Sequence, residues 1–219
     1  MPHHPAHNQA GAAPAAASAP TPLDVSPGQT MVFLGDSITA ADPGFVGVLQ
    51  QALAHTRPEL GLRVIAAGVP GDTVDNLLAR LPDALAAHPA WVVICIGAND
   101  YRAGAEPGLA PFLAAYAGLI GRLREAGATP ILMTIPVIEA LDANPPIPDP
   151  RAYNAAIEAL AAREGLRVVD LYRAFYEVHE RAANYKQRVA LSSDGIHPNS
   201  QGHTLIARTI LTQLGLLRK

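Results

Sequence analysis

Short continuous apolar segments alternate along the chain with longer segments in which apolar residues recur every three or four positions. The short segments show no polar alternation, which is typical of strands whose two faces are both covered by helices. This pattern predicts five strands, at residues 31–34, 62–66, 91–96, 130–135 and 167–170.

The longer segments predict amphipathic helices between the strands. Residues 107–126 carry one apolar stripe and are followed by Gly127, a residue favoured just after a helix. Residues 74–85 carry a similar stripe, in which Pro82 is expected to kink or divide the helix. Further helices are predicted at 173–188 and 205–214. Strands that alternate with helices in this way predict an α/β fold, a three-layer α/β/α sandwich with a parallel sheet.

Length and composition fit one such domain. The chain has 219 residues, of which 49% are apolar and 16% charged, which is enough for one sizeable core. Residues 1–27 are rich in Ala and Pro and cannot bury enough apolar surface to offset the entropy of ordering them. We therefore predict a disordered tail at 1–27 and a folded domain at 28–219.

Charge and cysteine content narrow the classes of function. A formal net charge of -3 without a basic run gives no reason to expect a nucleic-acid partner. The single cysteine, Cys95, excludes an internal disulfide framework and a cysteine-based zinc cluster. No apolar run reaches the roughly 18 residues of a membrane-spanning helix. The first residues lack the basic start of a signal peptide, which favours the cytoplasm and leaves export open. The oligomeric state is not predicted.

Candidate chemistry collects directly after the strands, where ligands bind in an open parallel sheet. The first strand is followed by Gly35-Asp36-Ser37-Ile38-Thr39. This order puts a serine at the start of a helix, beside unpaired amides and the positive end of the helix dipole. Taken alone, Ser37 is better explained as a helix N-cap, a position that serine favours.

The next two strands are followed by segments that can supply hydrogen-bond donors. After the second strand, the turn Gly68-Val69-Pro70-Gly71-Asp72-Thr73 can point the Gly71 amide at a ligand, or can be a plain capped turn. After the third strand, the side chain of Asn99 can donate to a developing oxyanion, or can satisfy backbone groups of its own loop.

A fourth motif lies near the C-terminus, where Asp194 and His197 stand three residues apart in a compact turn. A base that is oriented by a carboxylate is what an activated serine requires. A metal site on this pair is not favoured, because no further ligands stand close by in sequence. Asn199 or Ser200 is the expected cap of the last helix.

Taken together and in this order, the four motifs resemble those of the SGNH/GDSL hydrolase superfamily over everything except the tail. The resemblance implies a flavodoxin-like sheet of strand order 2-1-3-4-5 and a serine esterase without metal or organic cofactor. It assigns Ser37 as the nucleophile, His197 as the base and Asp194 as the residue that orients it. The implied oxyanion hole consists of the backbone N–H groups of Ser37 and Gly71 and the side chain of Asn99. Two departures from the family's second motif remove no proposed catalytic atom.

The substrate is expected to be a small-molecule acyl ester of short to medium chain length, because no extended apolar lid is evident. Candidate substrate contacts are Asp36, Tyr101 and Arg102. The proline-rich residues 137–150 are interpreted either as a stiff cover beside the site or as a solvated surface loop.

Three other functions remain open from the sequence. Two of them lie within the superfamily, namely a thioesterase or lysophospholipase-like activity on longer acyl chains and a carbohydrate acetyl esterase. The third is a non-catalytic binding module that keeps the fold, since a fold does not guarantee activity. Intact candidate residues at all four motifs favour an enzyme.

Overall fold

A computed structural model describes residues 21–102, 108–137, 150–184 and 190–217. Five parallel strands form one sheet in the order β2-β1-β3-β4-β5, which confirms the flavodoxin-like order implied by the family resemblance. The strands are β1 (Thr30–Gly35), β2 (Arg63–Gly68), β3 (Trp91–Cys95), β4 (Thr129–Met133) and β5 (Arg167–Val169). Each begins and ends within about two residues of its predicted position.

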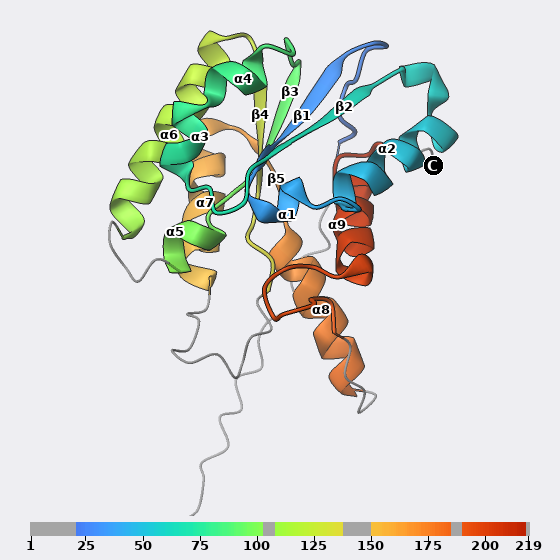
Figure 1. Cartoon of the computed structure of the whole chain (residues 1–219), viewed down its shortest axis with the longest axis vertical. Helices are drawn as coiled ribbons and strands as arrows, with labels where there is room; N and C mark the ends of the chain where they lie inside the picture. The colour runs from blue at the N-terminus through green and yellow to red at the C-terminus, as the bar shows by residue number, and fades with distance from the viewer. Residues whose placement is uncertain (1–20, 103–107, 138–149, 185–189, 218–219) are drawn as a thin grey trace, which may run out of the picture.

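Helices cover both faces of the sheet and make the predicted three layers (Figure 1). One face carries α3 (Val74–Ala79), α4 (Leu81–Leu85), α6 (Leu109–Glu125) and α7 (Arg151–Glu164). The other carries α2 (Phe45–Thr56), α8 (Leu171–Asn184) and α9 (Ser200–Gln213). Short helices α1 (Ser37–Ala40) and α5 (Ala98–Arg102) follow β1 and β3, and a 3-10 turn spans Pro58–Leu60. No described helix is both long and apolar enough to cross a membrane.

The apolar side chains of the strands belong to two separate hydrophobic cores, one on each face of the sheet. Because successive side chains of a strand point to opposite faces, Met31 and Phe33 of β1 pack with α2 and α9. Val32 and Leu34 pack on the other side with α3 and α6. All four side chains are fully buried, and each stabilises the fold by about 1.5–3 kcal/mol relative to exposure.

Pro82 divides the predicted helix at 74–85, as expected. α3 ends at Ala79 and α4 begins at Leu81, with Pro82 in its first turn, where the missing N–H has no intrahelical partner to lose. Arg80 stands at the junction.

Residues 21–27, which the sequence assigned to the tail, include a side chain that packs on the folded domain. Leu23 is only 6% exposed and packs on the core of α2 and α9, and its N–H donates to Leu214 O at 2.7 Å. The Arg167 guanidinium also donates to the carbonyls of Thr21 and Pro22. The Ala- and Pro-rich composition of the segment as a whole gave no indication that a single leucine, Leu23, would pack in the core. Residues 1–20 lie outside the described part of the chain.

The parallel strands bring the segments that follow them to one edge of the sheet. α1, α5 and the loop before α9 all lie toward the lower edge of the sheet in Figure 1. Gly68 at the end of β2 permits α1 to lie close to it, because a Cβ there would collide with the backbone of Thr39 and Ala40 in α1. The four sequence motifs therefore converge on the carboxyl edge of the sheet.

Candidate active site

Ser37 is the first residue of α1, directly after the buried strand β1. The N-cap is Asp36, whose Oδ1 accepts a hydrogen bond from the Ile38 N–H at 3.0 Å. The interpretation of Ser37 as a mere N-cap is therefore wrong. Because Ser37 stands at the first helical position, its own N–H has no acceptor within the helix. The half-buried hydroxyl and this amide thus lie together at the edge of the sheet.

His197 reaches Ser37 across the sheet edge. Its Nε2 lies 3.0 Å from Ser37 Oγ, and its Nδ1 lies 2.6 Å from Asp194 Oδ2. The other carboxylate oxygen of Asp194 accepts from the N–H groups of Ile196 and His197 at 2.9 and 2.7 Å, which holds the turn closed. Serine, imidazole and carboxylate thus form one hydrogen-bonded chain, the arrangement that activates a serine nucleophile.

The turn that carries this pair is fixed at both ends. Ser193 N–H donates to His197 O at 2.9 Å, and Asn199 N–H donates to Leu191 O at the same distance. Asn199 then caps α9, its side chain accepting from the N–H groups of Gln201 and Gly202, as predicted. The imidazole is therefore held by the start of a regular helix.

Two carboxyl groups that interact with the imidazole have pKa values shifted in opposite directions. Burial raises the pKa of Asp194, but the hydrogen bonds from His197 and Ile196 outweigh it and lower the value to about 2. Burial raises the pKa of Asp36 to about 6, against the opposing effects of the Ile38 hydrogen bond and the charge of His197. At neutral pH Asp194 is fully ionised, as a partner of an imidazolium must be.

The other two predicted oxyanion donors lie on neighbouring segments. Gly71 stands in the turn after β2 with a φ of 85°, a conformation that favours glycine. Asn99 lies in the first turn of α5 and donates from Nδ2 to Asp72 O at 2.9 Å. The alternative interpretation, that Asn99 satisfies loop backbone, holds for this bond. A carboxamide has two N–H groups, so one remains for a ligand while the other fixes the orientation.

Two of the predicted substrate contacts have buried side chains in the structure. Asp36 is 2% exposed and is engaged in capping α1. Tyr101 is 4% exposed and packs against the Tyr153 ring at 5.8 Å between centroids, within the core beneath α6 and α7. The side chain of Arg102 lies outside the described residues, as do residues 138–149 of the predicted cover.

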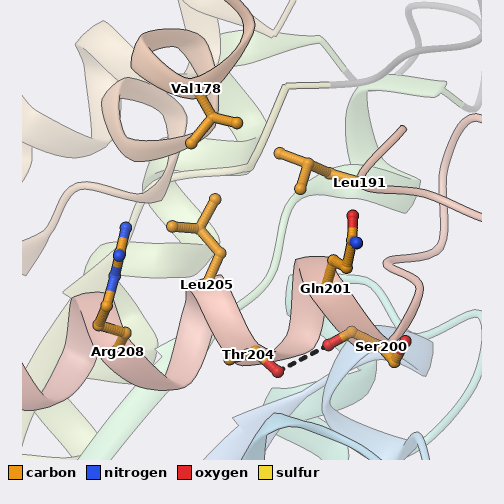
Figure 2. Close-up of a pocket in the computed structure, with 7 residues that line it drawn as sticks. All are labelled: Val178, Leu191, Ser200, Gln201, Thr204, Leu205 and Arg208. Carbon is orange, nitrogen blue, oxygen red and sulfur yellow. Dashed lines mark hydrogen bonds between the residues drawn. The ribbon is translucent and has the colours of Figure 1, made fainter. Parts of the chain in front are cut away.

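A separate hollow of about 360 Å³ lies between α8 and α9 (Figure 2). Its lining residues are Val178, Leu191, Ser200, Gln201, Thr204, Leu205 and Arg208. Ser37, Asp194 and His197 do not line it, so it is distinct from the candidate active site. Within the described ranges, no group of three or more His, Cys, Asp or Glu side chains is arranged to hold a metal ion.

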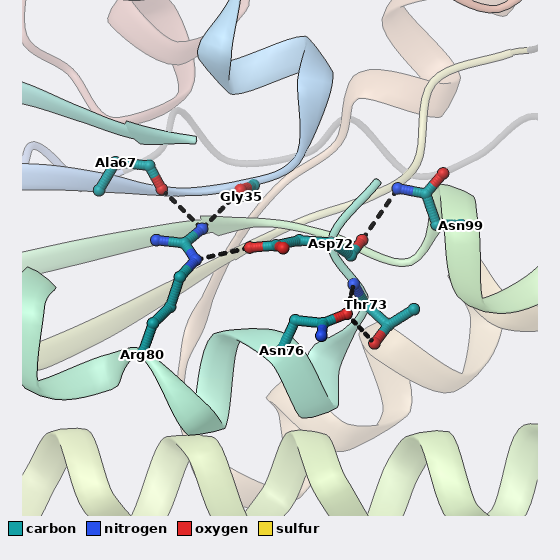
Figure 3. Close-up of polar contacts among 7 residues, drawn as sticks. All are labelled: Gly35, Ala67, Asp72, Thr73, Asn76, Arg80 and Asn99. Atoms are coloured by element: carbon teal, nitrogen blue, oxygen red, sulfur yellow. Dashed lines mark hydrogen bonds and ion pairs between the residues drawn. The ribbon is translucent and has the colours of Figure 1, made fainter. Parts of the chain in front are cut away.

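Two residues that sequence analysis missed hold the same edge of the sheet. Arg80 pairs with Asp72 and donates to carbonyls at the ends of β1 and β2 (Figure 3). Asn154 of α7 accepts from the N–H of Ile135 at 2.7 Å and donates to its carbonyl at 2.9 Å, just after β4. Both act on backbone groups, so no sequence motif marks them.

A flavodoxin-like sheet with a Ser-His-Asp chain at its carboxyl edge is typical of serine hydrolases. The chain belongs to the GDSL-like lipase/acylhydrolase family, whose model matches residues 33–205, and it is a carboxylic ester hydrolase.

Its relatives are esterases and thioesterases. It is 29% identical over 216 residues to an acetylxylan esterase of Geobacillus stearothermophilus, covering 88% of this chain and 97% of the relative. Esterase TesA of Pseudomonas aeruginosa is 34% identical over 179 residues, with 78% and 80% covered. Thioesterase 1/protease 1/lysophospholipase L1 of Escherichia coli is 30% identical over 187 residues, with 84% and 83% covered. The crystal structure of the Geobacillus acetylxylan esterase superimposes with a TM-score of 0.76 at 30% identity, over 90% of this chain and all of that one.

Proposed function

We propose that the protein is a serine esterase that removes short acyl groups, acetyl above all, from hydroxyl groups of carbohydrates through an acyl-enzyme on Ser37. The observation that carries the chemistry is the chain of contacts from Ser37 Oγ through His197 to Asp194, at 3.0 and 2.6 Å. The carbohydrate substrate rests on the acetylxylan esterase, which this chain matches over 97% of the relative's length.

The proposed reaction has two halves. His197 takes the proton of Ser37 as the hydroxyl attacks the ester carbonyl, and Asp194 stabilises the resulting imidazolium. The N–H groups of Ser37 and Gly71 and the Asn99 amide receive the oxyanion. His197 then protonates the leaving alcohol, and water repeats the sequence on the acyl-enzyme. Catalytic mutants of the Geobacillus esterase replace a serine, an aspartate and a histidine, the last two three positions apart as in this chain.

A chain-length series tests the proposal. Hydrolysis of p-nitrophenyl esters from acetate to palmitate is measured for the wild type, Ser37→Ala and the control Ser200→Ala, an exposed serine at the start of α9. We expect activity on acetate that Ser37→Ala abolishes and Ser200→Ala keeps. Acetate release from acetylated xylooligosaccharides then tests the carbohydrate. Activity that survives in Ser37→Ala would refute the nucleophile.

A second candidate is a thioesterase or lysophospholipase activity, favoured by the 30% identity to the Escherichia coli enzyme. It predicts a rate that rises toward long acyl chains and a preference for acyl thioesters. A non-catalytic binding module predicts no reaction with a fluorophosphonate probe, whereas the proposed enzyme gains the mass of one phosphonyl group on Ser37.

A further inference from the structure

Arg80 contacts three segments at once, the ends of β1 and β2 and the turn that carries Asp72 (Figure 3). Its Nε donates to Asp72 Oδ2 at 2.5 Å. One terminal nitrogen donates to Gly35 O at 2.9 Å and to Ala67 O at 3.0 Å. The Arg80 side chain is 19% exposed and that of Asp72 only 10%, so the pair is largely withdrawn from water.

Each acceptor of Arg80 is close in the chain to a proposed oxyanion donor. Gly35 ends β1 two residues before Ser37, and Asp72 directly follows Gly71. Asp72 O in turn accepts the hydrogen bond from Asn99 Nδ2 at 2.9 Å. The guanidinium therefore ties together the segments that carry all three donors.

The requirement is for an arginine rather than for any cation. A guanidinium carries five N–H donors in a rigid planar fork, so it can hold a carboxylate and two carbonyls in fixed relative positions. A lysine keeps the charge next to Asp72 but is a flexible point donor. An apolar residue leaves a buried carboxylate without its partner, which frees the Asp72 turn to move toward water.

We propose that Arg80 is a positioning residue of the oxyanion hole, which sets the Gly71 amide and the Asn99 side chain relative to Ser37 by holding Asp72 and the ends of β1 and β2. The inference rests on the proposed function, because it concerns the same three donors. It adds a residue that contacts neither substrate nor the Ser-His-Asp chain.

Steady-state kinetics on p-nitrophenyl acetate test this role in Arg80→Met, Arg80→Lys and Asp72→Asn. Displacing a donor costs less than the roughly 10²–10³-fold loss on removing one, so we expect Arg80→Met to lower kcat by about 10- to 100-fold. KM should change by less than about threefold, since the loss falls on the transition state. Arg80→Lys should recover part of the loss. The matched control is Arg122→Met, which removes a hydrogen bond to Leu78 O in α3, two residues before Arg80, and should keep kcat within about twofold.

A double-mutant cycle with Asn99→Ala separates positioning from general damage to the fold. If Arg80 acts through the oxyanion hole, Arg80→Met should lower kcat at least threefold less in the Asn99→Ala background than in the wild type. Equal factors in both backgrounds would overturn the proposal, as would an unchanged kcat in Arg80→Met. If Arg80→Met does not fold, Arg80→Lys and Asp72→Asn run through the same cycle with the same criterion. A wild type no more active than Ser37→Ala would instead overturn the proposed function, and this inference with it.

Discussion

Replacing Asp194 by asparagine tests which nitrogen of His197 carries the proton. Asp194 Oδ1 accepts from two backbone N–H groups, whereas Oδ2 faces His197 Nδ1 at 2.6 Å. In Asp194→Asn the carbonyl oxygen of the new amide keeps the backbone bonds, so its NH₂ group faces Nδ1. A neutral imidazole then accepts at Nδ1 and carries its proton on Nε2, which lies 3.0 Å from Ser37 Oγ. Such a histidine cannot take the serine proton.

The structure indicates how the loss of activity in Asp194→Asn compares with that in Asp194→Ala. The fall in the Asp194 pKa from 3.8 to about 2 corresponds to roughly 2.5 kcal/mol. The Asp194 side chain is 52% exposed, so solvent screening reduces this to about 1 kcal/mol, or a factor of about five in rate. Holding the histidine in the wrong tautomer costs far more, about 10⁴-fold in kcat in serine proteases. We therefore expect a loss of about 10³- to 10⁴-fold for Asp194→Asn and of about 5- to 100-fold for Asp194→Ala, where water can replace the carboxylate and either tautomer is allowed.

The assay compares kcat/KM for both variants on p-nitrophenyl acetate between pH 6 and 9, together with thermal unfolding. Asp194→Ala also loses the acceptor of two exposed backbone bonds, which costs about 1–2 kcal/mol of stability. The alanine variant should therefore be the less stable and the more active of the two, an inversion that misfolding does not produce. An asparagine variant at least as active as the alanine variant would show that the Oδ2 contact does not set the tautomer.

Three further predictions concern groups packed around the site. Asn154→Ala leaves the N–H and C=O of Ile135 buried without partners, and we expect chemical denaturation to show a loss of about 2–5 kcal/mol in the free energy of unfolding. His203 is 6% exposed, its pKa is lowered by burial, and its Nδ1 accepts from the Phe45 N–H. Because the unfolded state binds the proton more readily, stability falls as the pH drops below about 6.5, and His203→Gln should flatten the melting temperature between pH 7 and 5. Burial raises the Asp36 pKa to about 6, so the ionised carboxylate destabilises the fold above that pH and the penalty disappears as the pH falls toward 4. Asp36→Asn keeps an acceptor for the Ile38 N–H and should raise stability at pH 7 by about 2–3 kcal/mol, while kcat falls as His197 loses a nearby negative charge.

The sheet could be predicted from the sequence because its signals are local. Strands buried on both faces appear as uninterrupted apolar segments, and the division at Pro82 follows from the missing N–H of one residue. The order of the strands in the sheet, by contrast, has no local signal in the sequence. Nothing in the apolar pattern places β2 beside β1 at the sheet edge, so the order came only from the family resemblance.

The same distinction separates the predicted site residues that the structure brings together at the sheet edge from those that it buries. Ser37 and His197 stand 160 residues apart, and their pairing was predicted from the chemistry of the two motifs and from the family resemblance. Asp36 and Tyr101 also follow strands and carry polar groups, which made them candidate substrate contacts. Their side chains turn inward, Asp36 to cap α1 and Tyr101 to pack on Tyr153. Position along the chain locates the edge of the sheet, whereas the direction of a side chain depends on what packs around it.

Arg80 and Asn154 show why support for an active site is harder to predict than its chemistry. Both side chains bond mainly to backbone carbonyls and amides. Residues of almost any type carry these groups, so the sequence contains no recognisable partner for Arg80 or Asn154. Both act where the strand ladder ends and the backbone groups of the loops need other partners. A parallel sheet gathers its catalytic loops at this edge, and the same edge therefore needs side chains to fix it. In this protein, the residues most able to alter the geometry of the oxyanion hole are thus expected behind it, among the side chains that bind strand ends.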